Sequence, residues 1–399
     1  MFFLFGTKTL LAKLKLMKNK INIGIRGGYG LYNFGDDALI VALYQNLLAN
    51  DISEEDIYLF CIKNDYLNKQ LNNPNVIDYN HLDSSVEIKH LIYGGGTQFY
   101  SFDTDNQKKI KDILIKNPFL IFSKIRNQII LLLRKRFIES KFEIADYAKK
   151  IYLLGVGVGP FSKVNSTIEN KTANLFKKAD FISIRDTFSA EKCKEWKVKE
   201  FMHSPDLCYS MDVSKYLTHN SSLKKIGIVV RDWNHTGAQD YYDKLIQFVQ
   251  ILREKKYEVM FISLDKRSDI FWTKYFIESK ESFIQWDADK MTFDEFYTQF
   301  SDFDLHITAR FHGAVFASMF HIPFITIEVE QKLRMIAENY HGGAYCWKND
   351  FDLDKITRLV EKVEADYVEH KKVIITNTDK YKEIVQEQYK ELIKKICNN

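Results

Sequence analysis

The sequence predicts an α/β protein with two domains, each built around a parallel sheet. The chain has 399 residues, 46% of them hydrophobic, which is more than one core usually holds. Short apolar runs rich in β-branched residues alternate with longer amphipathic runs, as in strand and helix units around a parallel sheet. The alternation stops at one polar stretch and then restarts. This indicates a second unit of the same kind.

Five candidate strands lie in the first half of the chain. They are residues 21–25 (INIGI), 57–62 (IYLFCI), 90–95 (HLIYGG), 151–157 (IYLLGVG) and 181–185 (FISIR). We expect helices in the gaps between them. Residues 21–211 are therefore assigned to an N-terminal domain, with a basic and hydrophobic insertion over residues 101–150.

The polar stretch 212–225 (DVSKYLTHNSSLKK) is predicted to be a linker to a second domain over residues 226–399. A helix is expected over residues 238–256, and a helical tail rich in Lys and Glu closes the chain. The two sheets are expected to face each other across a cleft, with ligands beyond the carboxyl ends of their strands. The candidate strands are 226–231 (IGIVVR), 257–264 (YEVMFISL), 305–309 (LHITA) and 324–329 (FITIEV).

Residues 1–20 (MFFLFGTKTLLAKLKLMKNK) are predicted to be a basic leader. Its apolar runs are too short for a signal peptide, and the chain contains no run of about 18 apolar residues that would suggest a spanning helix. The five cysteines are far apart and include no CxxC pair, which argues against a disulfide framework or a structural zinc site. A formal charge of +4, spread along the chain, does not call for nucleic acid as a partner.

Three glycine-rich turns follow predicted strands: residues 26–40 (RGGYGLYNFGDDALI), 93–99 (YGGGTQF) and 155–160 (GVGVGP). Glycines let a backbone approach a ligand closely, so this edge of the sheet is where we expect a substrate. The spacing does not match GxGxxG and no Walker lysine follows, which disfavours dinucleotide and P-loop sites. A simple strand-to-helix turn capped by Asp36 remains an alternative for the first cluster.

Two strand ends carry arginines. Arg185 and Asp186 lie at the end of the predicted strand 181–185, and Thr187 and Ser189 could cap the next helix. An arginine beside a helix N-terminus suits a phosphate or a carboxylate, although Arg185 could simply pair with a neighbouring carboxylate.

The same arrangement recurs in the stretch TARFHGAVFASMF, where Arg310 and His312 stand between a predicted strand and a predicted helix. A buried histidine bonded to a carbonyl is the alternative interpretation of His312.

Residues 117–141 (NPFLIFSKIRNQIILLLRKRFIESK) interleave cations with apolar residues. From Lys108 to Lys141 there are ten Lys or Arg against two acids. This pattern favours an interfacial helix on anionic lipid. An ordinary amphipathic helix packed on the sheet is the alternative.

Six segments occur in order along the chain: YGLYNFGDDA, YGGGTQF, GVGVGP, SIRDTFS, SPDLCY and ARFHGAVFASMFHIPFITI. Together, from about residue 21 to about residue 340, they resemble the polysaccharide pyruvyl transferase family. The resemblance implies a GT-B-like pair of Rossmann-like domains. It also implies transfer of a pyruvyl group from phosphoenolpyruvate to sugar hydroxyls of a surface polysaccharide or its lipid-linked precursor.

Phosphoenolpyruvate carries a carboxylate and a phosphate on three carbons, so its site needs cations and helix N-termini. Arg185, Arg310 and Lys332 are expected to bind it. His312 is expected to act as general acid or base, or to bind the phosphate. Asp36 is a second catalytic candidate. The residues expected to line the acceptor site are Gly30, Asn33, Gly35, Gly95, Gly96, Gln98, Gly157 and Asp206.

No cofactor is expected beyond the donor substrate, and no metal, because HExxH and clustered-carboxylate motifs are absent from the sequence. The expected location is the cytoplasm, at the inner face of the membrane if the acceptor is lipid-linked. Two other functions remain open on the same scaffold. One is a glycosyltransferase that uses a nucleotide sugar, with Glu328 or Glu330 near the ribose; the other is a non-catalytic glycan-binding relative.

Overall fold

The computed structural model describes residues 20–61, 65–72, 74–81, 86–101, 138–217, 220–233 and 237–398. Most of the predicted leader, most of the predicted insertion and the predicted interfacial helix up to residue 137 lie outside the described residues. Among the described residues, no helix combines the length and the apolar character needed to cross a bilayer.

Two units divide the chain, and neither is one continuous stretch. Unit 1 comprises residues 1–28, 43–205 and 388–399, and unit 2 comprises residues 29–42 and 206–387. Helices α2 (Phe34–Ala49) and α14 (Tyr367–Cys397) each contribute residues to both units. The observed units differ from the predicted domains at residues 29–42 and 388–399, and the second unit resumes at residue 206.

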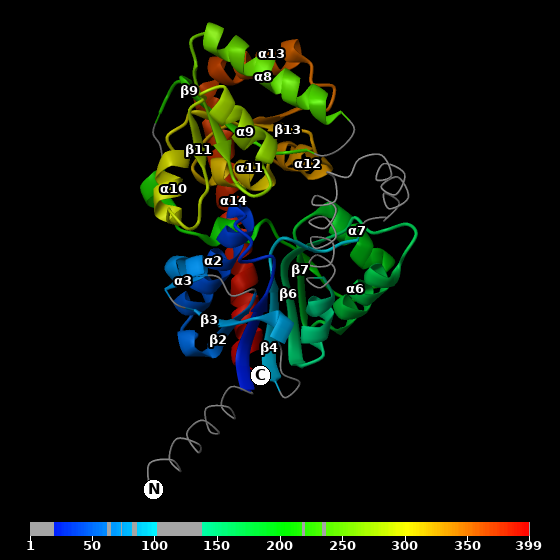
Figure 1. Cartoon of the computed structure of the whole chain (residues 1–399). Helices are drawn as coiled ribbons and strands as arrows, with labels where there is room; N and C mark the ends of the chain where they lie inside the picture. Colours follow the sequence, from blue (N-terminus) through cyan, green and yellow to red (C-terminus); the bar gives the residue numbers. More distant parts are fainter. Residues whose placement is uncertain are drawn as a thin grey trace, which may run out of the picture. The chain divides into compact units, whose positions relative to one another are not determined.

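Unit 1 contains a parallel sheet with the strand order β3-β2-β1-β4-β6-β7-β8, and β5 pairs with β6. Its helices include α3 (Asp65–Leu71), α6 (Thr167–Lys178) and α7 (Thr187–Glu195). Figure 1 shows α6 and α7 beside β6 and β7. The strands are β1 (Lys20–Arg26), β2 (Ile57–Phe60), β3 (Asn75–Ile77), β4 (Glu87–Gly94), β5 (Thr97–Phe99), β6 (Ala148–Val158), β7 (Phe181–Ile184) and β8 (Met202–His203).

Unit 2 contains a second parallel sheet, with the order β11-β10-β9-β12-β13-β14. Its strands are β9 (Lys225–Val230), β10 (Glu258–Ser263), β11 (Phe283–Gln285), β12 (Leu305–Thr308), β13 (Phe324–Ile327) and β14 (Ala344–Trp347). Its helices include α8 (Ala238–Glu254), α9 (Ile270–Glu278), α10 (Phe293–Phe300), α11 (Phe311–Met319), α12 (Gln331–Asn339) and α13 (Leu353–Ala365). In Figure 1, α8 lies beside α13.

Both sheets follow the strand order of Rossmann folds. In each, the first strand of the unit is flanked by the second strand on one side and the fourth on the other. The connections run outward in opposite directions from this point, and ligands of such sheets bind beyond the carboxyl ends of the strands there. The relevant ends are those of β1 and β4 in unit 1 and those of β9 and β12 in unit 2.

The nine strands predicted from the sequence are confirmed within a few residues, whereas β3, β5, β8, β11 and β14 were not predicted. Four of the missed strands have only two or three residues, which is too short for a periodic pattern to identify. Helix α8 is confirmed within two residues of its predicted end, and it buries the apolar face formed by Tyr241, Leu245, Phe248 and Leu252.

The stretch 212–225, predicted to be a linker, packs as part of unit 2. The Tyr216 ring lies 5.4 Å from the Tyr297 ring and 5.8 Å from the Phe320 ring, between centroids. The carboxylate of Asp304 accepts hydrogen bonds from the backbone amides of Lys224 and Lys225, both at 2.8 Å. The polar composition of this stretch did not reveal the packing of the Tyr216 ring or the hydrogen bonds from its backbone to Asp304.

Residues 29–42 belong to unit 2 because of one buried aromatic ring. Phe34 is fully buried, and its ring centroid lies 4.6 Å from that of Phe296 and 4.8 Å from that of Phe316. Its backbone amide donates to the carbonyl of Leu264, which follows β10, at 3.0 Å. The first turn of α2 is therefore fixed to the core of unit 2.

Candidate functional site

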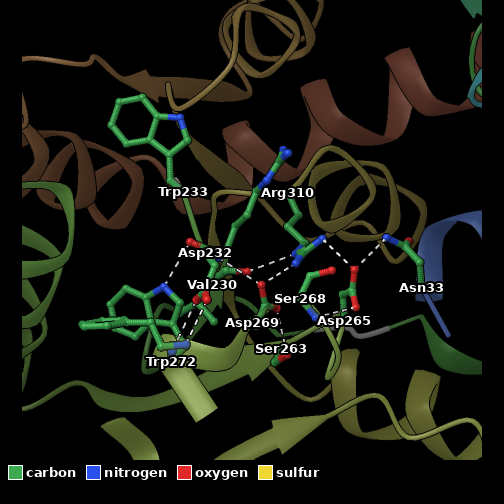
Figure 2. Close-up of polar contacts among 12 residues, drawn as sticks. Asn33, Val230, Asp232, Trp233, Ser263, Asp265, Ser268, Asp269, Trp272 and Arg310 are labelled. Atoms are coloured by element: carbon green, nitrogen blue, oxygen red, sulfur yellow. Dashed lines mark hydrogen bonds and ion pairs between the residues drawn. The ribbon is translucent and has the colours of Figure 1, made fainter. Parts of the chain in front are cut away.

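Arg310 lies at the strand-order reversal of unit 2, at the carboxyl end of β12. Its Nε donates to the carbonyl oxygen of Val230, the last residue of β9, at 3.3 Å. Its Nη2 donates to the Asp269 carboxylate, and its Nη1 lies 3.8 Å from Asp265 Oδ2. Figure 2 shows the guanidinium directed at both carboxylates, with Asn33 on the far side of Asp265.

The charge of Arg310 is largely neutralised by two carboxylates of the protein. Its side chain is 12% exposed, that of Asp269 is fully buried and that of Asp265 is 9% exposed. Burial acts to lower the pKa of Arg310, but the two carboxylates outweigh it and the pKa is raised. One cation against two anions gives the cluster a formal charge of −1. A negatively charged donor would meet this cluster only with some repulsion, so Arg310 as a direct contact to the donor stays a prediction.

Asp269 is held by more than the arginine. Its Oδ2 accepts from Ser263 Oγ at 2.9 Å, and its Oδ1 accepts from the backbone amide of Asp232 at 3.1 Å. Asp232 in turn accepts from the amide of Phe271, in the first turn of α9, at 2.9 Å. Burial raises the pKa of Asp232 above its usual value. Arg310 is therefore positioned by a network that joins the ends of β9, β10 and β12.

His312 lies in the first turn of α11, and its Nε2 is 3.5 Å from Asp206 Oδ2. Asp206 is 2% exposed and stands before a short 3₁₀ helix, Leu207–Ser210, where its Oδ1 accepts from the amide of Cys208 at 3.1 Å. The structure thus brings together two residues for which the sequence predicted different roles, catalysis and acceptor binding. The aspartate can orient the imidazole, which makes an Asp–His pair.

Gly35 fixes the other side of the imidazole. A Cβ atom added at Gly35 would lie 1.9 Å from His312 Nδ1, a separation that no side chain could adopt. Asn33 prepares this approach: its Oδ1 accepts from the amides of Gly35 at 3.0 Å and Asp36 at 3.3 Å. Its Nδ2 donates to Asp265 at 3.3 Å. Asn33 therefore links the first turn of α2 to the Arg310 cluster.

The remaining predicted residues of unit 2 lie before or at the start of α2 and at the start of α12. Asp36 is in the first turn of α2 beside Gly35, and the amide of Gly30 donates to Asp37 Oδ1 at 3.2 Å. Lys332 Nζ lies 2.8 Å from Glu330, which also pairs with Arg231 at 2.5 Å.

Burial acts to raise the pKa of Glu330, but Lys332 and Arg231 outweigh it and lower the pKa to about 2. Lys332 could therefore bind a donor only while it also pairs with Glu330.

The predicted residues of unit 1 lie near the carboxyl ends of β4, β6 and β7 and in β5. Arg185 Nη2 donates to Thr97 Oγ1 at 2.8 Å. A Cβ atom at Gly157 would lie 3.0 Å from Asp186 Oδ2 and 3.2 Å from Arg185 Nε, so glycine is needed for this close approach. Asp186, rather than Thr187 or Ser189, caps α7: its Oδ1 accepts from the amide of Ser189 at 2.8 Å.

Gln98 has a structural role that the sequence did not reveal. Its Nε2 donates to the carbonyl oxygens of Gly94 at 3.1 Å and Gly95 at 2.7 Å, and its side chain is buried. The amide therefore holds the turn formed by Gly95 and Gly96, whose φ angles are 63° and 75°. Contact between this side chain and an acceptor stays a prediction.

Three residues of the site were missed by sequence reasoning. Asp265 and Asp269 follow β10 within the stretch LDKRSD, and two acids just after a predicted strand were the available signal. Cys208 lies beside Asp206 in the segment SPDLCY, but nothing in the sequence places it near His312. The side-chain donor atoms of Asp206, Cys208 and His312 all lie within 4.8 Å of one another.

Two parallel sheets with Rossmann strand order define an α/β protein of the GT-B-like class. Solved structures with this fold are similar to it. A putative UDP-N-acetylglucosamine 2-epimerase from Listeria monocytogenes covers 96% of this chain and 98% of its own, with a TM-score of 0.55 and 10% identity. A glycosyltransferase from Rickettsia africae covers 96% and 99%, with a TM-score of 0.54 and 12% identity. At such identities the similarity shows the fold alone.

The family follows from the sequence match. The model of the polysaccharide pyruvyl transferase family matches residues 33–331, which include the Arg310 cluster, the Asp206–His312 pair and Arg185. The chain belongs to the polysaccharide pyruvyl transferase family, whose members are transferases acting on polysaccharides.

One curated relative, a GTP cyclohydrolase 1 type 2 homolog from Ureaplasma parvum serovar 3, is 34% identical over 101 residues. That match spans 25% of this chain and about a third, 34%, of the relative.

Proposed function

We propose that the protein transfers a pyruvyl group from phosphoenolpyruvate to a pair of sugar hydroxyls of a polysaccharide or its lipid-linked precursor. The observation that carries the proposal is the Asp206–His312 pair at the start of α11, within a chain of this family. Ketal formation needs a group that moves protons, and an imidazole oriented by a buried carboxylate is suited to it.

The reaction balances in two steps. In the first, a proton adds to the methylene carbon of phosphoenolpyruvate and one sugar hydroxyl, losing its proton, attacks C2. In the second, the other hydroxyl attacks C2, the bond from C2 to the phosphate oxygen breaks, and the phosphate leaves with the remaining proton. Both steps move a proton between a hydroxyl and another atom, so one group able to take and return it can serve both.

In this proposal His312 moves that proton. The Asp206 carboxylate lies 3.5 Å from Nε2 and can orient the ring, and Gly35 packs beside Nδ1. The first turn of α11 has no side-chain cap, since its N-cap residue is Arg310. The positive end of the helix dipole is therefore suited to the donor's anionic groups.

The donor is tested by thermal shift of the full chain with phosphoenolpyruvate, set beside UDP, GDP and CMP. A ligand that binds only the folded protein stabilises it by about 2.7 kcal/mol at 100 times its Kd. We expect a rise in melting temperature with phosphoenolpyruvate and none with the nucleotides. The reverse pattern would overturn the donor and support a glycosyltransferase that uses a nucleotide sugar.

His312→Ala is the variant that tests the mechanism. We expect loss of transfer by at least about 100-fold, the lower range for a general acid or base, with the melting temperature nearly unchanged. Retained turnover would contradict the role of His312. Arg310→Ala is a poor control because it would leave Asp269 buried without its cation, a change that costs about 3–5 kcal/mol.

A further inference from the structure

Asp206, Cys208 and His312 form a cluster of metal-ligand side chains in unit 2. Their carboxylate, thiol and imidazole atoms lie within 4.8 Å of one another. Asp206 and Cys208 are buried, and His312 is partly buried. Two of the residues belong to the 3₁₀ turn after residue 205 and the third to the start of α11, two elements that contact each other.

The imidazole nitrogen in this cluster is buried and lacks a normal hydrogen bond. His312 Nε2 has no hydrogen-bond partner among the described residues. Asp206 Oδ2 lies 3.5 Å away, outside the usual range of about 2.7–3.2 Å. A separation of 3.5 Å does match two ligands of one tetrahedral zinc ion, which are about 3.3–3.6 Å apart at normal bond lengths.

The neighbours of the cluster hold its donors in place. Asp206 Oδ1 is fixed by the amide of Cys208, which leaves Oδ2 directed at the imidazole. Gly35 packs beside Nδ1, and Nε2 faces Asp206 Oδ2 at 3.5 Å. Fixing ligands through such outer contacts is how proteins orient metal sites.

We propose that Asp206, Cys208 and His312 bind one divalent transition-metal ion of the zinc type, with a fourth position left for water or substrate. A carboxylate, a thiolate and a neutral imidazole carry a charge of −2, which balances the ion. The thiolate favours zinc, iron or cobalt over magnesium and calcium, which prefer oxygen ligands. A metal on Nε2 would keep the ring proton on Nδ1, so metal binding by His312 and proton transfer by His312 exclude each other.

The test uses Co²⁺ as a spectroscopic probe for zinc in the full-length, chelator-treated and reduced protein. We expect one Co²⁺ per chain, with the visible bands of a tetrahedral site and a near-ultraviolet band from sulfur-to-metal charge transfer. Zn²⁺ should remove both, and excess Mg²⁺ should leave them unchanged. Absence of the charge-transfer band in the wild type, or its loss with Mg²⁺, would overturn the proposal.

Two ligand variants and one matched control decide which residues bind. Cys208→Ser should abolish the charge-transfer band, and His312→Ala should weaken Co²⁺ binding by more than the roughly 10–100-fold typical of outer-contact changes. Cys193→Ser is the control, because Cys193 is also buried and burial raises its pKa to about 12. The band should survive in this variant.

Binding that persists in both ligand variants, or disappears in the control, would refute the site. His312→Ala keeps the test decisive if Cys208→Ser does not fold, since His312 lies on a different element, the first turn of α11. The readout needs no turnover, so failure of the metal site and failure of pyruvyl transfer remain separate results.

Discussion

At the residue scale, the site depends on how closely Gly35 approaches His312. A side chain at residue 35 would overlap the imidazole, since its Cβ would lie 1.9 Å from Nδ1. The glycine is in the first turn of α2, where alanine would normally favour the helix by up to about 1 kcal/mol. The absence of a side chain is therefore required by the histidine and not by the helix.

This gives a double-mutant prediction. Gly35→Ala should destabilise the protein by about 1–3 kcal/mol, the usual range for overpacking. In a His312→Ala background the same change should become neutral or stabilising, because the overlapping atoms are gone. Urea unfolding of the four proteins measures the coupling. Equal costs in both backgrounds would mean that the two residues do not touch.

His306 is a buried histidine outside the candidate site, and it predicts a dependence of stability on pH. Its Nε2 donates to the carbonyl oxygen of Phe300 at 2.9 Å, and the rings of the two residues stack at 4.1 Å between centroids. Burial lowers its pKa from 6.5 to about 3. Between these pH values the unfolded chain binds a proton that the folded chain does not.

The stability that His306 contributes is therefore complete above pH 6.5 and lost as the pH falls toward 3, by about 1.4 kcal/mol per pH unit. Urea unfolding at pH 7 and at pH 5 should show a smaller loss in His306→Gln than in the wild type. If the two proteins lose the same stability, His306 is not buried in its neutral form.

At the element scale, α7 is positioned by Asp186 at its N-cap. The carboxylate accepts from the amide of Ser189 at 2.8 Å, and Ser189 Oγ accepts from the amide of Val158 at 2.9 Å. The sequence indicated a helix start at this point but gave Thr187 and Ser189 as the caps. A capping residue is identified by its extended backbone, and several adjacent residues could have adopted one.

Asp186→Ala should destabilise α7 by about 1 kcal/mol, whereas Asp186→Asn should cost less because an amide oxygen also caps a helix. Hydrogen exchange of the α7 amides measures both changes. Equal effects of the two substitutions would show that the charge of Asp186, rather than its cap, stabilises this region.

At the scale of the whole molecule, each unit is built from segments that are not contiguous in the sequence. The last residues of α14 belong to unit 1, although the preceding part of that helix belongs to unit 2. Leu392 is fully buried and Ile396 is 5% exposed. Lys395 Nζ lies 6.0 Å from the centroid of the Phe181 ring, in β7 of unit 1. Residues 388–398 are therefore part of unit 1.

Leu392→Ala should lower the stability of unit 1 by about 2–5 kcal/mol, as for other buried leucines. Hydrogen exchange should show lost protection in β6 and β7, which are remote from residue 392 in the sequence. Lys394→Ala, at an exposed residue of the same helix turn, should change nothing. Protection lost only in unit 2 would contradict the division into units.

The sequence by itself determined the α/β class, nine of the strands and the segments that carry the site. Strand and helix periodicity is local, so apolar runs such as IGIVVR and LHITA could be recognised without the fold. The Arg310–His312 segment was identified for the same reason: polar residues between a predicted strand and a predicted helix stand out against apolar neighbours. The family match to residues 33–331 is consistent with those segments.

Only the tertiary structure decided what these residues touch. Whether Arg310 faces a ligand or two carboxylates depends on Asp265 and Asp269, which come from another strand end. The pairing of His312 with Asp206, its proximity to Cys208 and the need for Gly35 join three segments far apart in the chain. Such contacts follow from the order of strands in the sheet, and no local pattern encodes that order.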